Sequence, residues 1–467
     1  MRSDRTSARR SPGAPPAPPA AAPRPAASAA RVPPSAAVLL PAAVALLLAL
    51  SGPAPGAAQG RDDERMDGEY GLYVGVSDDS LDVRWVTRAA GPAFVRLVRG
   101  GNVVDSAGSS SGRGHVVLFR RPRGSRVTLE YGSVSDSSDR HATELRLDAP
   151  KPDRKPRYDA PDSLYVLGDV HGEFDNLIGV LRNAGLVGPD LSWSGSKATL
   201  VLVGDLVDRG PDATRVLWYA YRLERQAAAA GGRVLVMLGN HEIMVMTDDL
   251  RYTMGKERLV ATLEGLPYWR LLDPRRSLLG RWLASKPALA RVGNVLFAHG
   301  GLGYGYADWS LRTFQDSLSK YVNGEVFRIW ADTAYRPDPR RVRGMDSLAV
   351  IRRFDFFFGD SSVFWYRGYV RSDTLGAELA HALGRHHAAV HVVGHTPIRT
   401  LRQSYGDSLI AVDMLDPASE MLLMVRDDSG RAEGGWRRYR IGLEGPAEPL
   451  KPSGAAEIEE GSAPGSG

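Results

Sequence analysis

The distribution of apolar residues divides the chain beyond its first 60 residues into two regions with different periods. Over 68–149 apolar and polar positions alternate, as in 81–85, and turns rich in Gly, Ser and Asp separate the runs. Such alternation predicts short, half-buried strands. Over 162–441 short continuous apolar runs alternate instead with stretches of helical spacing, such as 214–229. This second pattern predicts an α/β domain whose sheet is covered by helices on both faces.

Composition places further boundaries along the chain. The short, evenly spaced strands of 68–149 are typical of a small antiparallel β-sandwich of the fibronectin-III type. This region holds no cluster of chemical groups, so it is interpreted as a spacer or brace, or alternatively as a binding module. Residues 150–161 are rich in Pro, Lys, Arg and Asp, which predicts a linker. Residues 247–290 and 304–388 are rich in Trp, Tyr, Arg and Leu and are predicted to be mostly helical insertions, while the Pro/Gly/Glu-rich residues 444–467 are predicted to be disordered.

The first 58 residues have the order of a secretory signal. Arginines and a Pro/Ala tract come first, an uncharged apolar run follows over 36–50, and small residues end the segment. The run contains Pro41 and is shorter than the roughly 20 residues that span a bilayer as a helix. A cleaved signal peptide over 1–58, and hence a periplasmic or secreted protein, is therefore predicted. An uncleaved membrane anchor is the alternative, in which case only this leader would contact a membrane.

Charge and cysteine content exclude several classes of partner and site. The formal charge of +5 belongs to residues 1–58, which hold six arginines and one aspartate, so that 53 basic and 53 acidic side chains remain. This balance argues against a nucleic-acid partner. The absence of cysteine excludes disulfides, thiolate metal sites and cysteine nucleophiles. Any metal ion must therefore be bound by His, Asp, Glu or Asn.

Polar residues follow five of the predicted buried strands directly, and each cluster contains glycine together with His, Asp or Asn. These strands are 164–167, 199–203, 234–238, 295–298 and 390–393. Loops at the carboxyl ends of strands in an open α/β sheet converge on one crevice, so residues far apart in sequence can form one site there. The candidate metal ligands in these loops are Asp169, His171, Asp205, Asn240, His299 and His395.

The chemistry of these side chains indicates a binuclear metal centre. Imidazole nitrogens and hard oxygens without thiolate suit zinc, iron or manganese better than calcium. Six ligands exceed what one tetrahedral zinc needs, and a central carboxylate can bridge, so two metal ions about 3.5 to 4 Å apart are predicted. The expected cofactors are manganese ions or an iron/zinc pair.

The order of the clusters resembles that of the calcineurin-like metallophosphoesterases. Within them it is similar to the phosphoprotein phosphatase branch, with GDxHG, GDxVDRG, GNHE, HGG and GHT in succession over about 162–425. The stretches 249–252 and 365–368 resemble the Shewanella-like bacterial protein phosphatases, whereas 412–415 replace the Ser-Ala-Pro-Asn-Tyr segment of eukaryotic members. The resemblance implies a mixed two-sheet β core flanked by helices. It also implies that Asp205 bridges two metals, the first held by Asp169 and His171 and the second by Asn240, His299 and His395.

Four further residues near these clusters have side chains suited to phosphate-ester hydrolysis. A hydroxide bridging two metal ions can act as the nucleophile near neutral pH. The guanidinium groups of Arg209 and Arg367 match phosphate oxygens, and they are predicted to bind substrate together with Asn240. His241 is predicted to protonate the leaving group, with Asp208 orienting its ring; a role for His241 as an extra metal ligand is the competing interpretation.

The predicted function is therefore an exported, metal-dependent phosphatase that hydrolyses phosphate monoesters, on phosphoproteins at Ser/Thr or Tyr or on small phosphate esters. One alternative is a symmetrical dinucleoside tetraphosphatase, which resembles the same motif order. The other is a binding protein whose phosphatase domain has lost its activity.

Overall fold

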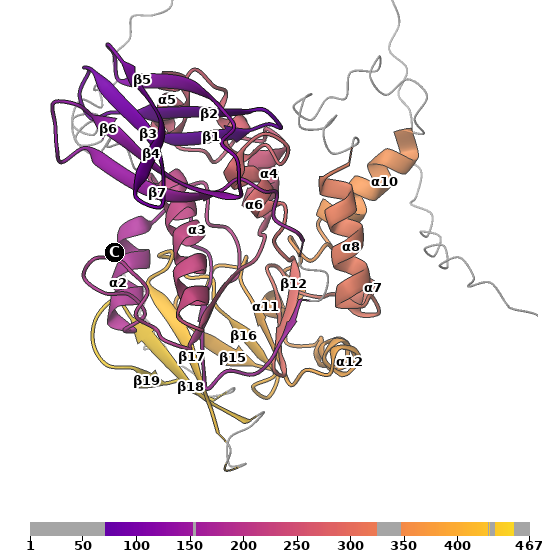
Figure 1. Ribbon diagram of the computed structural model, residues 1–467. Helices are drawn as coiled ribbons and strands as arrows, with labels where there is room; N and C mark the ends of the chain where they lie inside the picture. The colour runs from indigo at the N-terminus through magenta and orange to yellow at the C-terminus, as the bar shows by residue number, and fades with distance from the viewer. Residues whose placement is uncertain (1–70, 153–155, 325–346, 428, 430–434, 453–467) are drawn as a thin grey trace, which may run out of the picture. The chain divides into compact units, whose positions relative to one another are not determined.

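The computed structural model describes residues 71–152, 156–324, 347–427, 429 and 435–452 (Figure 1). The predicted leader, residues 1–58, lies outside this part of the chain. Among the described helices, none has both the length and the hydropathy needed to cross a bilayer.

The N-terminal part of the described chain is all-β. It consists of an antiparallel sheet of order β1-β2-β5 and a second antiparallel sheet of order β4-β3-β6-β7. The strands are β1 (Leu72–Val76), β2 (Ser80–Val86), β3 (Ala93–Arg99), β4 (Asn102–Ser109), β5 (Gly114–Arg120), β6 (Arg126–Ser133) and β7 (Arg140–Arg146). Alternate residues of both sheets, such as Trp85, Val95 and Leu129, are buried in one core. This agrees with the all-β region expected ahead of the α/β domain.

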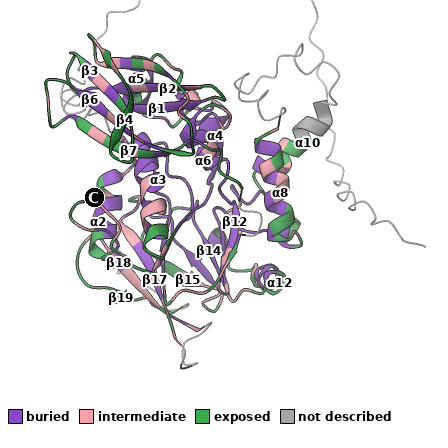
Figure 2. Cartoon of the chain, in the orientation of Figure 1, coloured by how far each residue is buried: buried purple, intermediate pink, exposed green. Residues whose placement is uncertain are grey.

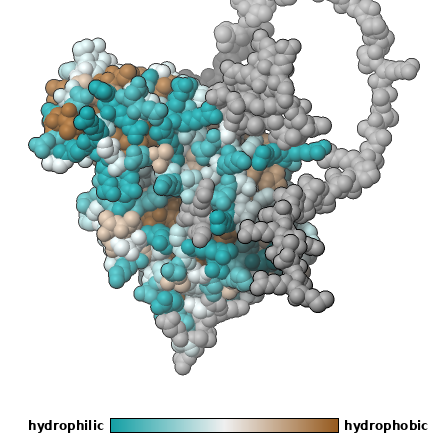
Figure 3. Space-filling model, turned by 45° about the vertical axis from the view of Figure 1, so that its right-hand side comes forward, coloured by the Kyte–Doolittle hydropathy of each residue, from teal (hydrophilic) through white to brown (hydrophobic). Residues whose placement is uncertain are grey.

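Strand β4 does not follow the alternation of apolar and polar residues that was expected over 68–149. Most of its residues are exposed, as the green ribbon in Figure 2 shows, so its apolar residues do not follow a buried face. It is held instead by backbone pairing with β3 at the edge of the sheet. Val103 and Val104 of β4 and Val116 and Leu118 of β5 are exposed, and Figure 3 shows hydrophobic atoms gathered on this β region.

The α/β region contains two six-stranded mixed sheets, of orders β11-β10-β9-β17-β18-β19 and β15-β16-β14-β13-β12-β8. The first contains β9 (Ser163–Leu167), β10 (Thr199–Leu202), β11 (Arg233–Val236), β17 (Glu420–Arg426), β18 (Trp436–Gly442) and β19 (Glu448–Pro449). The second contains β8 (Arg157–Tyr158), β12 (Leu289–Val292), β13 (Val295–Ala298), β14 (Val390–Val393), β15 (Arg402–Ser404) and β16 (Leu409–Ala411). This confirms the two-sheet core implied by the resemblance and corrects the single covered sheet expected from the hydrophobic pattern.

The continuous apolar runs arise because each central strand is buried on both faces. In β10, Leu200 and Leu202 belong to the cluster that contains the helices α2 and α3, whereas Val201 belongs to the cluster that contains Phe297 and Val392 of the other sheet. A strand buried in this way needs apolar residues at every position. Figure 1 shows α3 beside the first sheet, and Figure 2 shows β14 buried within the second.

Helices connect the strands and fill the two long stretches between them. The first group is α2 (Phe174–Asn183), α3 (Ala213–Ala229), α4 (Asn240–Met246), α5 (Gly255–Leu263), the 3-10 helix η2 (Tyr268–Leu272) and α6 (Leu278–Leu283). The second group is α7 (Tyr304–Ala307), α8 (Leu311–Val322), α10 (Ser347–Phe358), α11 (Gly368–Arg371) and α12 (Gly376–His386). The amphipathic face of α8 buries Leu311, Phe314 and Leu318, as expected for a surface helix with 3.6-residue spacing.

Two short strands correct the expected boundaries. Arg157–Tyr158, within the predicted linker, pair with β12 in parallel, and Glu448–Pro449, within the predicted disordered tail, pair with β18. Two-residue strands contain no hydrophobic period, so the sequence pattern does not reveal them. The remainder of the predicted tail, 453–467, lies outside the described residues.

The all-β region closely approaches the helix α5. A Cβ atom added to Gly114 would lie 1.8 Å from the carbonyl oxygen of Leu263. The guanidinium of Arg84 donates hydrogen bonds to the carbonyl oxygens of Glu264 (3.0 Å) and Gly265 (3.3 Å). These backbone contacts support the interpretation of this region as a brace for the segment that follows α5.

Gly114→Ala is expected to lower the free energy of unfolding by about 1–3 kcal/mol, because the methyl group overlaps a backbone oxygen. The change is measured by thermal or urea unfolding of the purified protein. Gly108→Ala is the matched control, since the nearest atom to its added Cβ is 3.6 Å away. Equal stability losses in the two variants would contradict a close contact at Gly114.

Helix α5 also carries a buried acid against the beginning of α3. The carboxylate of Glu257 accepts hydrogen bonds from the backbone N–H (3.1 Å) and the hydroxyl (2.5 Å) of Thr214. Burial raises the pKa of Glu257 from its ordinary value of 4.5 to about 7. The neighbouring Lys256 forms a buried ion pair with Asp212.

Glu257→Gln is expected to stabilise the protein at pH 8 by about 1–3 kcal/mol relative to the wild type. The folded protein keeps a proton on Glu257 up to about pH 7, whereas an unfolded chain releases it near pH 4.5. This group therefore makes the wild type less stable as the pH rises from 4.5 to 7. Melting temperatures of both proteins at pH 5 and pH 8 test this; a difference that does not grow with pH contradicts the prediction.

Candidate metal centre

The candidate site lies at the carboxyl ends of parallel strands from both sheets. Strands β9, β10 and β11 are parallel in the first sheet, and β13, β14 and β16 are parallel in the second. The first sheet provides Asp169, His171, Asp205, Asp208, Arg209, Asn240 and His241, and the second provides His299 and His395. The predicted ligands thus come from both sheets, although they were expected from one.

The carboxylate of Asp205 lies at the centre of this arrangement. Its Oδ2 is 3.1 Å from Nε2 of His299 and 3.9 Å from Nε2 of His171. Nε2 of His299 is also 2.9 Å from Oδ1 of Asn240, and Nε2 of His171 is 3.7 Å from Oδ2 of Asp169. All five side chains are buried.

His395 joins the same group from the other side. Single ligand atoms of Asp205, His299 and His395 lie within 4.8 Å of one another. The backbone N–H of His395 donates to Oδ1 of Asp169 (3.2 Å), and its ring lies 5.1 Å from that of His299. The structure therefore brings all six predicted ligands together.

Two imidazole nitrogens in this group suit metal ions. Nε2 of His171 and Nε2 of His395 are buried and have no hydrogen-bond partner among the described residues, although buried polar atoms normally have one. Nδ1 of His171 lies 3.0 Å from the carbonyl oxygen of Val207, so it carries the proton and leaves Nε2 with a free lone pair. Burial lowers the pKa of His171 to about 4 and that of His395 to about 2. Both rings are therefore neutral at pH 7, which is the form that binds metals.

The buried acids give the site an excess of negative charge. Burial, and then the charge of Asp413, raises the pKa of Asp169 well above its usual range. Burial acts in the same direction on Asp205, but His299 and His241 hold its pKa well below the usual range. Burial would lower the pKa of His299, yet Asp205 and Asp169 raise it to about 10. Positive charge is thus favoured at this point, as a pair of cations would provide.

Tight loops bring the ligands close to one another. His171 and Asp205 have φ angles of 48° and 51°, in the left-handed region that costs a non-glycine residue about 1–3 kcal/mol. Gly239 and Gly394 make room for the carboxylates. A Cβ on Gly239 would lie 2.1 Å from Oδ1 of Asp205, and one on Gly394 would lie 2.5 Å from Oδ1 of Asp169.

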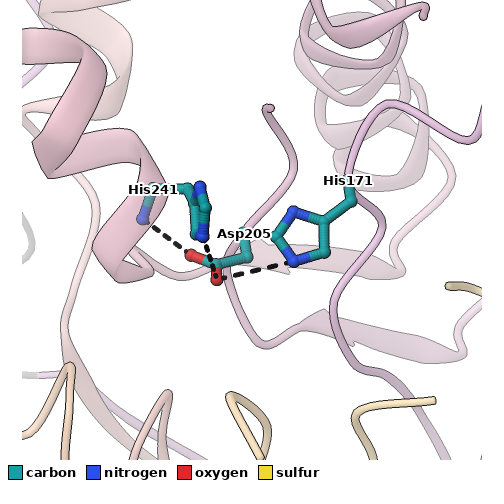
Figure 4. Close-up of side chains that lie close together, drawn as sticks. All are labelled: His171, Asp205 and His241. Carbon is teal, nitrogen blue, oxygen red and sulfur yellow. Dashed lines mark hydrogen bonds and ion pairs between the residues drawn. The ribbon is translucent and has the colours of Figure 1, made fainter. Parts of the chain in front are cut away.

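His241 lies beside the centre with both ring nitrogens occupied. Its Nδ1 is 2.8 Å from Oδ2 of Asp208, and its Nε2 is 3.3 Å from the guanidinium of Arg209. Figure 4 shows Asp205 between the rings of His171 and His241, and Nε2 of His241 is 3.9 Å from Oδ2 of Asp205. Distance alone would allow His241 to be a ligand. Nε2 of His241 has a hydrogen-bond partner, which Nε2 of His171 and Nε2 of His395 lack among the described residues, and this favours the predicted acid–base role.

The two predicted phosphate-binding arginines reach the centre from different loops. Arg209, with a φ of 64°, follows Asp208, and its guanidinium lies 5.6 Å from the ring centre of Tyr252. Arg367 directly precedes α11 and donates a hydrogen bond to the carbonyl oxygen of His395 at 2.5 Å. The guanidinium of Arg209 therefore contacts the predicted acid His241, and that of Arg367 contacts the predicted ligand His395.

Three buried residues of the site were not assigned a role from the sequence. Asp413 follows β16 and shares a hydrogen bond with Asp169; burial raises its pKa to about 6. The hydroxyl of Thr253 donates to Oδ1 of Asp208 (2.8 Å). The carboxylate of Glu242 accepts backbone N–H bonds from Gly239 (2.7 Å), Asp205 (2.9 Å) and Leu206 (2.7 Å) and so ties two ligand loops together.

A sequence signal existed for two of these residues. Asp413 ends an apolar run over 409–412, in the same way as the five clusters that were identified, and Glu242 is the acid of GNHE. Thr253 left no such signal, because its partner Asp208 is 45 residues away in the chain.

Comparisons with known proteins agree with this geometry. The family model "Calcineurin-like phosphoesterase" matches residues 163–407, more than half of the chain. "Shewanella-like protein phosphatase 2" of Arabidopsis thaliana is 27% identical over 239 residues, covering 42% of this chain and 59% of that protein. "Bis(5'-nucleosyl)-tetraphosphatase, symmetrical" of Escherichia coli is 28% identical over 198 residues, covering 40% of this chain and 61% of that protein. The chain thus spans about three fifths of the length of these two relatives.

A solved structure is similar over a larger share of the chain. The cold-active protein-tyrosine phosphatase of a psychrophilic Shewanella species is 26% identical, with a TM-score of 0.53, and the match covers 71% of this chain and 97% of that one. The similarity to Shewanella-like phosphatases confirms the predicted phosphoprotein phosphatase branch. The chain belongs to the calcineurin-like phosphoesterase family.

Proposed function

We propose that this protein is an exported phosphatase that hydrolyses phosphate monoesters on proteins and uses two metal ions. The observation that carries the proposal is the convergence of the predicted ligands on Asp205, with two buried imidazole nitrogens that lack a partner among the described residues. The family match and the relatives named as protein phosphatases support the same reaction class.

The residues of this chain divide between metal binding and substrate binding. One metal would be held by Asp169, His171 and Asp205, and the other by Asp205, Asn240, His299 and His395. When bound, two such ions lower the pKa of a water to supply a nucleophile, and they neutralise charge on the phosphoryl group. Arg209 and Arg367 would bind the remaining phosphoryl oxygens through their planar N–H groups.

His241 would protonate the oxygen of the leaving group. Arg209 can only donate, so in this structure Nε2 of His241 accepts its N–H and carries no proton. A phosphoryl oxygen offers Arg209 a charged partner, and the shift of the guanidinium to substrate would free Nε2 for protonation. Asp208, itself held by Thr253, orients the ring and stabilises its charged form.

The substrate class rests on the relatives and on the proposed location. The relatives named as protein phosphatases support phosphoproteins, and the Shewanella structure named as a tyrosine phosphatase supports the inclusion of phosphotyrosine. The tetraphosphatase relatives support a second candidate, hydrolysis of symmetrical dinucleoside tetraphosphates. An exported protein would not meet such cytosolic nucleotides, and the order of residues 1–58 is that of an export signal.

The proposal is tested with the purified protein reconstituted separately with Mn, Fe, Zn and Co. Elemental analysis should find close to two metal ions per chain. Activity should be higher on phospho-Ser, phospho-Thr or phospho-Tyr peptides than on diadenosine tetraphosphate. Faster turnover of the nucleotide would favour the second candidate, and the absence of both metal and activity would overturn the proposal. N-terminal sequencing of the protein recovered from the cell envelope or medium tests export and cleavage.

A further inference from the structure

A pocket of about 800 Å³ opens beside the metal centre. Its wall includes Arg367, whose guanidinium bonds the carbonyl of His395, and Thr396, which follows His395. The rest of the wall comes from α11, from residues 397–403 and 448–452, and from Leu415 and Arg440. A chain whose phosphorylated side chain enters the metal centre would therefore pass this pocket.

The pocket has a strong excess of positive charge. Among the described residues, six basic side chains and one acid, Glu448, line it. The basic residues are Arg367, Arg371, Arg399, Arg402, Arg440 and Lys451. Basic and acidic residues are balanced over the chain beyond residue 58, so this excess is a local feature. It marks a surface suited to anions.

Half of these cations are available to a ligand. Arg402 donates to the carbonyl oxygen of Val370, and Arg440 pairs with Glu420 and Glu448. Among the described residues, the side chains of Arg371, Arg399 and Lys451 form no ion pair, and all three are exposed. These three residues are named the free cations below.

Two further observations on the wall point to an anionic ligand. The hydroxyl oxygen of Thr396 is buried, although it has no hydrogen-bond partner within the described part of the chain. Arg367 and Arg371 both line the pocket and lie one helical turn apart, since the backbone N–H of Arg371 donates to the carbonyl oxygen of Arg367 (3.1 Å). An anion placed between two guanidinium groups is attracted by both charges.

We propose that this pocket binds acidic side chains that flank the phosphorylated residue of a peptide substrate. The inference rests on the proposed phosphatase function. The described part of the lining contains no aromatic side chain, whereas single nucleotide bases are usually held by stacking on such rings, so this lining favours a peptide over a nucleotide. Apolar residues such as Ile398 and Leu401 also line it and suit the aliphatic parts of a peptide. Its volume falls in the range of roughly 300–1,000 Å³ that is usual for ligand pockets.

The test compares two phosphopeptides that differ only in having Asp and Glu, or Asn and Gln, beside the phosphorylated residue. The wild type should hydrolyse the acidic peptide with a kcat/KM about 5- to 30-fold higher than that for the neutral peptide, because the acidic side chains can form up to three exposed ion pairs with the free cations. The variant Arg371→Ala/Arg399→Ala/Lys451→Ala should lose this preference and keep its turnover of p-nitrophenyl phosphate. The preference of the wild type should also decrease as salt is raised.

A matched variant separates the pocket from general charge effects. Arg120→Ala/Arg123→Ala/Arg437→Ala removes the same charge from exposed residues outside the pocket, and it should keep the full preference. Equal effects of the two triple variants would overturn the proposal, as would a wild type that treats both peptides alike while hydrolysing p-nitrophenyl phosphate. Loss of diadenosine tetraphosphate turnover in the pocket variant, with the peptide preference intact, would assign the pocket to nucleotides instead. A wild type inactive on every ester would contradict the phosphatase function itself.

Discussion

Asp205→Asn is expected to lower phosphatase turnover by at least about 10³-fold and to leave the protein without its full complement of metal ions. The expected effect is larger than the roughly 10- to 100-fold loss caused by removing a residue that only orients a ligand. The carboxylate of Asp205 lies close to histidines from both sheets, at 3.1 Å from Nε2 of His299 and 3.9 Å from Nε2 of His171. Asparagine keeps the shape but loses the charge that can bridge two cations.

The measurement is elemental analysis together with turnover of p-nitrophenyl phosphate at saturating metal. Asp175→Asn is the control, because Asp175 is an exposed aspartate on α2. Thermal unfolding of the metal-free proteins checks that the variant still folds. Two tightly bound metal ions and near-normal turnover in Asp205→Asn would show that the carboxylate is not the shared ligand.

His241→Asn is expected to keep metal content near normal while lowering turnover of poor leaving groups by about 10² to 10⁴. The ring is bound through Nδ1 to Asp208, and in the proposed mechanism its Nε2 protonates the leaving oxygen. A leaving group that departs without a proton should depend on this ring less. The loss should therefore be larger for phenyl phosphate than for p-nitrophenyl phosphate.

Metal analysis and the two esters, compared in wild type and variant, separate the alternatives for His241. Loss of both metals would make the residue a ligand. Equal losses on the two esters would exclude proton donation as its main role. Thr253→Val serves as a companion variant, because it removes only the hydroxyl that bonds Asp208 and should give a smaller loss of the same kind.

The candidate ligands could be identified from the sequence because each follows an apolar run directly. A buried strand and the loop at its carboxyl end are local features, so the hydrophobic pattern and a short motif are enough to predict them. The number of sheets could not be found in this way. A strand such as β10 is apolar throughout whether its second face meets a helix or another sheet, and Val201 meets the second sheet.

The contacts that support the site residues could not be predicted from the sequence for a different reason. The bonds from Thr253 to Asp208 and from Arg209 to His241 join loops that become neighbours only in the folded chain. Strand β4 left no pattern because its side chains lie mostly in solvent on both faces. Contacts of these kinds depend on the tertiary arrangement, which local propensity does not encode.

Because the predicted ligands come from two sheets, the spacing between the sheets affects the distances between the ligands. Side chains such as Val201, Phe297 and Val392 form the layer that sets the spacing between the sheets. A substitution there would move one half of the ligand set against the other without touching a ligand. Substitutions that change only the volume of these apolar side chains can therefore change the metal preference and the temperature optimum of the enzyme.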